Sequence, residues 1–160
     1  MSDSFLTSLQ RQNAAVADLT RQERPAAALT LTRSATLAIV TTGTVITWQT
    51  QTRGQGITWS GTTITIPTAG YYLIQTLLGT SANVTMYSQL IINTVNVGYY
   101  AYTWTATTYH VGSIMRYFAT GDTVQINVIP SANVNITQTT ETVSNASPWL
   151  HITQLTSVVV

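Results

Sequence analysis

Few side chains in this sequence could carry out acid–base chemistry, and they are far apart along the chain. There are two histidines, His110 and His151, and five acidic residues. Only Asp122 and Glu141 among these acids fall after the first 26 residues. General acid–base catalysis needs convergent carboxylates or a histidine beside a nucleophile. A turn carboxylate and a loop carboxylate form a poor catalytic pair, so we predict that the protein is not an enzyme.

The same residues bear on metal binding. His110 and His151 occupy separate predicted strands, and they could meet on one face or at a symmetry axis to bind a metal. Histidines in strands more often form hydrogen bonds within the fold. The chain has no cysteine, which excludes disulfides and thiolate ligands. We therefore expect no metal and no cofactor.

Charge is scarce throughout the chain. Only 7% of the residues are charged, against roughly 25% in ordinary soluble proteins. The six arginines are scattered and lysine is absent, whereas nucleic-acid binding needs clustered phosphate contacts. No segment approaches the roughly 18 apolar residues of a membrane span. We expect a soluble protein that binds neither nucleic acid nor membrane, and whose surface is partly covered by identical copies or by a partner.

Aromatic residues offer a further possibility, because aromatic faces can stack on sugar rings. The chain has four tryptophans and eight tyrosines. All four tryptophans fall in predicted strands, so packing in the core or in an interface is the preferred interpretation. The tryptophans are Trp48, Trp59, Trp104 and Trp149.

The first part of the chain is the only one with a helical pattern. Between Ser4 and Arg24, apolar residues recur four, seven and three positions apart, which is typical of a narrow stripe on a helix. Pro25 then ends the helix. We place a helical arm at residues 1–26 and a β domain at 27–160. The arm either lies on its own domain, forms a three-stranded coiled coil, or anchors the protein to a larger assembly. The expected anchoring side chains are Phe5, Leu6, Leu9, Val16 and Leu19.

From Ala28 onward the sequence has the texture of an antiparallel β protein. Short β-branched runs are broken by glycine, proline and asparagine at intervals of about 8 to 12 residues. Residues 29–33 and 62–66 alternate with period two, which is typical of half-buried strands. Residues 71–78 and 86–92 are apolar at consecutive positions and are expected to be buried on both faces. The polar stretch 131–147 is expected to be a long loop or an exposed hairpin.

Three motifs occur in a fixed order in this β region. The first is Ile64-Thr-Ile-Pro-Thr-Ala-Gly70-Tyr71-Tyr72, in which Pro67 to Gly70 form a turn before an aromatic pair. The second is Ser113 to Phe118 followed by Thr120-Gly121-Asp122, where we expect a hairpin turn. The third is the closing Trp149 to Leu155. Together they resemble the trimeric jelly-roll domain shared by tumour necrosis factor and complement C1q.

The resemblance covers about residues 28–155 and implies a fold and an assembly. The implied fold is an all-β jelly-roll sandwich of ten strands, preceded here by the short helical arm. The implied assembly is a homotrimer built around paired aromatic residues. The residues expected at the trimer interface are Tyr71, Tyr72, Tyr99, Tyr100, Tyr102, Tyr117 and Phe118.

A charge-poor trimer with an anchoring arm is similar to accessory proteins of bacteriophage virions. We expect a capsid decoration or cement protein that binds the major capsid protein, or other virion proteins, and stabilises the head. One alternative is a receptor-binding tail or baseplate tip whose loops recognise a host glycan. Another is a bacterial C1q-like structural protein of the cell surface.

Overall fold

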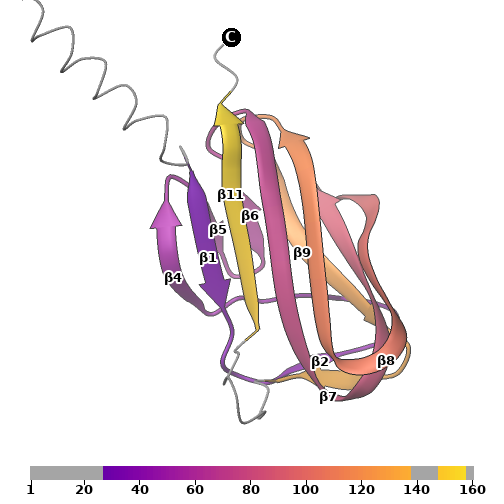
Figure 1. Ribbon diagram of the computed structural model, residues 1–160. Helices are drawn as coiled ribbons and strands as arrows, with labels where there is room; N and C mark the ends of the chain where they lie inside the picture. Colours follow the sequence, from indigo (N-terminus) through magenta and orange to yellow (C-terminus); the bar gives the residue numbers. More distant parts are fainter. Residues whose placement is uncertain (1–26, 138–147, 158–160) are drawn as a thin grey trace, which may run out of the picture.

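The computed structural model describes residues 27–137 and 148–157, and these residues form a sandwich of β-strands (Figure 1). Neither range contains a helix that is long and apolar enough to span a membrane. The predicted helical arm at residues 1–26, with its anchoring side chains, lies outside the described residues. The strands are β1 (Ala28–Thr32), β2 (Leu37–Ile39), β3 (Thr44–Val45), β4 (Thr50–Gln55), β5 (Thr58–Ser60), β6 (Thr63–Thr65), β7 (Gly70–Ile92), β8 (Val95–Phe118), β9 (Thr123–Pro130), β10 (Val134–Ile136) and β11 (Trp149–Ser157).

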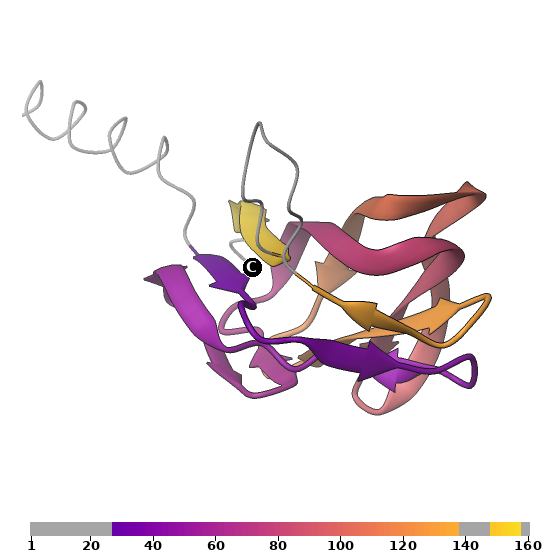
Figure 2. The ribbon, with the colours of Figure 1, turned by 90° about the horizontal axis from the view of Figure 1, so that it is seen from below.

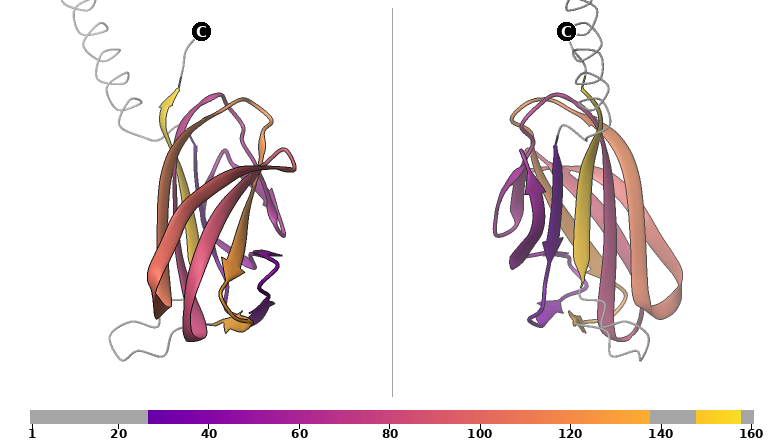
Figure 3. Two further views of the ribbon diagram at one scale, coloured as in Figure 1. Left: turned by 90° about the vertical axis from the view of Figure 1, so that its right-hand side faces the viewer. Right: turned by 60° about the vertical axis from the view of Figure 1, so that its left-hand side comes forward.

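Two long strands, β7 and β8, form a hairpin that runs through both layers of the sandwich (Figure 3). In the first layer, residues 70–77 of β7 pair with β11 on one side and with the end of β8 on the other. In the second layer, residues 86–92 of β7 pair with β9 and with the beginning of β8. The β7–β8 register shifts between Gly79 and Val84, where the hairpin passes from one layer to the other.

The remaining strands extend the two layers. The first layer continues from β11 to β1, and from β1 to its antiparallel partner β4. Beside β1, the backbone amide of Gln154 donates to the Ala27 carbonyl. The second layer continues from β9 to β6 and β5, and β3 also pairs with β9. The short strands β2 and β10 run side by side at the end of the sandwich seen in Figure 2.

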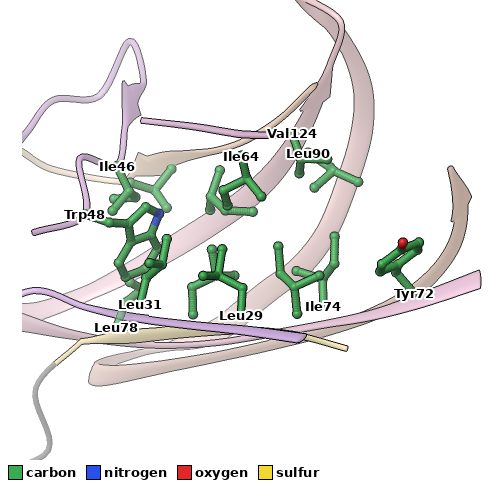
Figure 4. Packing of buried hydrophobic residues seen from close by; sticks show 14 of the residues in the cluster. Leu29, Leu31, Ile46, Trp48, Ile64, Tyr72, Ile74, Leu78, Leu90 and Val124 are labelled. Carbon is green, nitrogen blue, oxygen red and sulfur yellow. The ribbon is translucent and has the colours of Figure 1, made fainter. Parts of the chain in front are cut away.

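The core lies between the layers and follows from strict alternation along the strands. In β9, every second residue from Val124 to Pro130 is buried. Leu29, Ile74 and Leu78 of the first layer face Ile64, Leu90 and Val124 of the second, and each is at most 1% exposed (Figure 4). Full burial of one such side chain contributes about 1.5 to 3 kcal/mol, so this alternation fixes which face of each strand remains available for contacts.

The strand count differs from the ten that we predicted, because eleven strands form in the described residues. The predicted strands at 71–78 and 86–92 merge into β7, since the chain bends near Gly79 without leaving the sheet. The short strands β2, β4 and β10 were not predicted. They are only three to six residues long, and β4 is exposed at every position, so it has no alternation to detect.

The predicted turn at Gly121-Asp122 is present, although it does not close a hairpin. Gly121 has φ +85°, and the Asp122 carboxylate accepts a hydrogen bond of 2.8 Å from the Ala119 amide. The end of β8 pairs with β7 in the first layer, whereas β9 pairs with β7 in the second. The turn therefore connects the two layers.

Candidate functional site

The outer face of the first layer is largely apolar where it is formed by β7, β8 and β11. Alternation turns one side of β7, β8 and β11 away from the core, and this side carries large exposed side chains: Tyr71 (46% exposed), Val111 (68%), Met115 (61%), Tyr117 (47%) and Leu155 (47%). None of the outward residues on these strands is Asp, Glu, Lys or Arg. We call this surface the apolar face. It consists of Tyr71, Leu73, Gln75, Leu77, Val111, Ser113, Met115, Tyr117, Trp149, His151, Thr153 and Leu155.

Tyr71 and Tyr117 form the aromatic part of the apolar face. They are register partners on β7 and β8, and their rings meet edge to face with 5.5 Å between the centroids. The next pair along the ladder is Leu73 and Met115, followed by Gln75 and Ser113. The sheet therefore presents rows of contacting side chains with two half-exposed rings at one end, which is the kind of surface that protein interfaces use.

His151 lies in the middle of the apolar face as a neutral, hydrogen-bonded side chain. Its Nδ1 atom lies 2.8 Å from the Thr30 hydroxyl, and its Nε2 atom contacts the Thr153 hydroxyl. Burial lowers the pKa of His151, and the positive charge of Arg53 lowers it further. The ring therefore stays uncharged at neutral pH, in keeping with its surroundings.

Tyr72 and Phe118 lie on the opposite side of the same two strands, in the core. Tyr72 is 0% exposed and Phe118 1%, and their rings meet edge to face at 5.8 Å. The Tyr72 hydroxyl donates to the Thr68 carbonyl at 2.8 Å, and burial raises the pKa of Tyr72. The prediction that these two residues contact another copy is corrected, because both rings are enclosed within the subunit.

Tyr100 also points into the space between the layers. Its hydroxyl lies 3.1 Å from the Thr76 hydroxyl, and burial raises the pKa of Tyr100 to about 12. Tyr100 is partly buried and packs against the core cluster, so its contact with another copy stays a prediction.

Tyr99 and Tyr102 lie on a different surface, the outer face of the second layer. There they contact Tyr87, which no sequence motif marks. Tyr87 falls in the run 86–92, which we expected to be buried on both faces, yet it is 37% exposed. The seven predicted interface residues therefore divide into two on the apolar face, two in the core, one partly buried against the core, and two on the second layer.

The tryptophans have mainly packing roles where the structure describes them. Trp48 lies in the core and is 2% exposed. Trp59 packs against this core, and its Nε1 atom donates a hydrogen bond to the Gln51 side-chain oxygen at 3.0 Å. Trp149 is partly buried on the apolar face, opposite Leu77. The side chain of Trp104 lies outside the described part of the chain.

The titratable groups do not converge on a catalytic or metal site. His110 is buried and its ring contacts the hydroxyls of Thr103 and Thr80, on the side of the first layer opposite His151. The Asp122 carboxylate accepts hydrogen bonds from the Ala119 amide and, at 2.7 Å, from the Asn93 side chain. In the two described ranges, no group of three His, Cys, Asp or Glu residues could hold a metal. Glu141 lies outside those ranges.

Two β layers joined by one long hairpin form a β-sandwich whose fold is consistent with the jelly roll of tumour necrosis factor and C1q. No protein-family model and no curated protein matches the sequence. Among solved structures, the chain is similar to the vertex protein P5 of PRD1, with a TM-score of 0.64, 12% identity, and coverage of 82% of this chain and 99% of that chain.

Two eukaryotic structures share the same fold. Murine APRIL gives a TM-score of 0.58 at 17% identity, covering 81% of this chain and 98% of that chain. The globular domain of the zebrafish complement 1qA protein gives 0.57 at 10% identity, covering 84% and 99%. At these identities the likeness concerns the fold alone.

Proposed function

We propose that three copies of the chain associate through the apolar face and that the resulting trimer is a structural virion protein which binds and stabilises a capsid. The observation that carries the proposal is the apolar face itself. Its exposed rings and aliphatic side chains share the outward side of β7, β8 and β11 with no charged residue. Contiguous apolar patches of this kind mark interaction sites in soluble proteins.

The low charge of the chain also supports association between copies. With 7% charged residues and a net charge of +1, the subunit has little electrostatic protection against association. If three copies close around a threefold axis, every apolar face is covered, and association stops at the trimer. Tyr71 and Tyr117 are the proposed central contacts.

The virion role is supported by the fold neighbour whose name describes a vertex protein, PRD1 P5. A trimer that binds only the assembled lattice stabilises it by mass action, and three arms in one trimer raise the overall affinity by avidity. The proposed arm is residues 1–26, with Phe5, Leu6, Leu9, Val16 and Leu19 as gripping side chains. No catalytic role is assigned to any residue.

The assembly half of the proposal is tested by placing a charge on the apolar face. Met115 and Val95 are both on β8 and both 61% exposed, but only Met115 belongs to the apolar face. We expect Met115→Arg to give a monomer by mass photometry while Val95→Arg remains trimeric. A wild-type chain that sediments as a monomer at micromolar concentration would refute the trimer.

The capsid half is tested separately with purified capsids and with bacterial cells. The full-length trimer is expected to co-sediment with capsids and not with cells, and deletion of residues 2–24 is expected to abolish capsid binding while leaving the trimer intact. Adhesion to cells with no binding to capsids would instead favour the receptor-binding tip.

A further inference from the structure

A β-bulge in β8 brings three tyrosine rings together on the outer face of the second layer. Ser88 of β7 pairs with Ala101, whereas the next residue, Gln89, pairs with Tyr99. Tyr100 is therefore the extra residue of the bulge. In a regular strand, residues 99 and 102 would point to opposite faces because they are an odd number of positions apart. The bulge places Tyr99 and Tyr102 on one face, beside Tyr87 of the neighbouring strand.

These three residues form a surface that we call the tyrosine platform. The rings of Tyr87 and Tyr102 are stacked, with centroids 4.1 Å apart and an angle of 18° between the planes. The Tyr99 ring lies 5.1 Å from Tyr87 at 48°. A hydrogen bond with Tyr102 raises the pKa of Tyr87. Tyr99 remains 61% exposed although its ring is held in place by Tyr87.

The surroundings of the platform are polar but uncharged. In the antiparallel ladder, Tyr87 lies opposite Ile129 of β9, and the next pair on the same face is Gln89 and Asn127. The Asn127 amide donates to the Gln89 side-chain oxygen at 2.8 Å. Gln89 is only 6% exposed, so Asn127 is the amide of this pair that a ligand can reach. None of these flanking residues is Lys, Arg, Asp or Glu.

Exposed aromatic rings beside uncharged polar side chains favour one chemical class of ligand. A ring face carries negative potential and attracts the weakly positive C–H groups of a sugar ring. Amide and hydroxyl groups beside the rings can then bond the sugar hydroxyls and fix its orientation. Phosphate, sulfate and carboxylate groups are bound chiefly by Arg and Lys, and the platform has neither. We propose that the tyrosine platform is a binding site for an uncharged sugar unit of a polysaccharide.

The platform and the apolar face lie on different layers of the sandwich. A subunit can therefore use one surface without covering the other, and the inference holds whether the protein is a monomer or a trimer. It also goes beyond capsid binding, because it assigns the protein a second, carbohydrate partner.

The test is affinity electrophoresis of the full-length protein in native gels that contain one polysaccharide each. Dextran, mannan and galactan are the neutral probes, and heparin is the anionic comparison. We expect at least one neutral polysaccharide to retard the protein and heparin to leave it unretarded. We expect Tyr99→Ala to weaken the retardation by about twofold to tenfold, and Tyr99→Phe to retain it because the stacking face is kept.

Two controls separate loss of the platform from loss of the fold. Val95→Ala changes a side chain on the same strand with the same 61% exposure and should leave retardation unchanged. Near-ultraviolet circular dichroism checks that Tyr99→Ala keeps the packing of the buried Trp48. The proposal is overturned if no neutral polysaccharide retards the protein, if heparin alone does, or if Tyr99→Ala and Val95→Ala are retarded equally.

Discussion

The rings of Tyr71 and Tyr117 meet edge to face across the β7–β8 ladder, with 5.5 Å between their centroids and both side chains about half exposed. Each ring restricts the other, so the pair loses little conformational freedom when a second molecule packs on it. Their inward neighbours Tyr72 and Phe118 repeat the same edge-to-face contact inside the core. One ladder thus carries two aromatic pairs with different roles.

Removing the outer pair is expected to weaken assembly without unfolding the subunit. Truncating central aromatic residues of an interface typically costs more than about 1 kcal/mol, so Tyr71→Ala with Tyr117→Ala should raise the concentration at which the trimer half-dissociates by tenfold or more. Mass photometry across a dilution series measures this concentration. Tyr99→Ala removes an exposed ring from the other layer and should not change it. Equal effects of the two changes would contradict the assignment of the apolar face.

Removing the buried ring of Tyr72 is expected to destabilise the fold. Tyr72→Ala should lower the free energy of unfolding by about 3 to 5 kcal/mol, because it leaves a cavity in the core. Tyr72→Phe keeps the ring and loses only the hydrogen bond to the Thr68 carbonyl, which is worth about 0.5 to 1.5 kcal/mol. Urea titration at one fixed protein concentration gives both values. A Tyr72→Ala protein as stable as the wild type would place this ring outside the core.

Gly112 is required where the two layers approach each other. A Cβ atom at this position would lie 2.6 Å from the Tyr100 ring and 2.9 Å from both the Ala101 Cβ and the Thr76 hydroxyl. Gly112→Ala should therefore destabilise the protein by about 1 to 3 kcal/mol through overpacking. Ser113→Ala, at the next position on the exposed face, serves as the control and should change the unfolding midpoint little. A Gly112→Ala midpoint equal to that of the control would show that Tyr100 can move aside.

The sequence predicts the fold class well because the inward residues alternate clearly in β1, β6 and β9. Adjacent strand residues point to opposite faces, and accordingly Tyr71 is 46% exposed whereas Tyr72 is 0% exposed. The sequence could not predict that β7 continues past Gly79, because Gly-Thr-Ser-Ala-Asn at 79–83 has the composition of a turn.

The bulge at Tyr100 explains why the seven predicted interface residues do not share one surface. A bulge changes the face of every later residue in its strand, and nothing in Tyr99-Tyr100-Ala101-Tyr102 marks it. The sequence therefore groups these tyrosines together, whereas the structure turns Tyr100 toward the core and the other two to the outer face of the second layer. The predicted hairpin at Gly121-Asp122 fails for a related reason, since local residues specify a turn but not which layer the next strand joins.

His151 gives the protein a dependence on pH with a definite sign. Its pKa is lowered in the folded protein, first by burial and then by Arg53, so the unfolded chain binds a proton more readily. The stabilisation from the neutral ring is fully present above the unfolded pKa of about 6.5 and is lost as the pH falls below it. We expect the unfolding midpoint to decrease between pH 7.5 and pH 5.

The matched variant for this measurement is His151→Gln, which is uncharged at every pH. It leaves His110 in place, so any difference in slope between the two proteins belongs to His151. We expect a shallower decrease in the variant when thermal unfolding is followed at several pH values and one protein concentration. Identical slopes would exclude His151 as the source.

The β7–β8 hairpin has a consequence for how the chain reaches its native state. Its two strands are joined by the short turn at Asn93 and Thr94, both with positive φ, so their pairing needs only local closure of the chain. Once the β7–β8 hairpin has formed, it already contains a pair of hydrogen-bonded strands in each layer. β9 and β11 can then pair with strand edges that already exist in each layer.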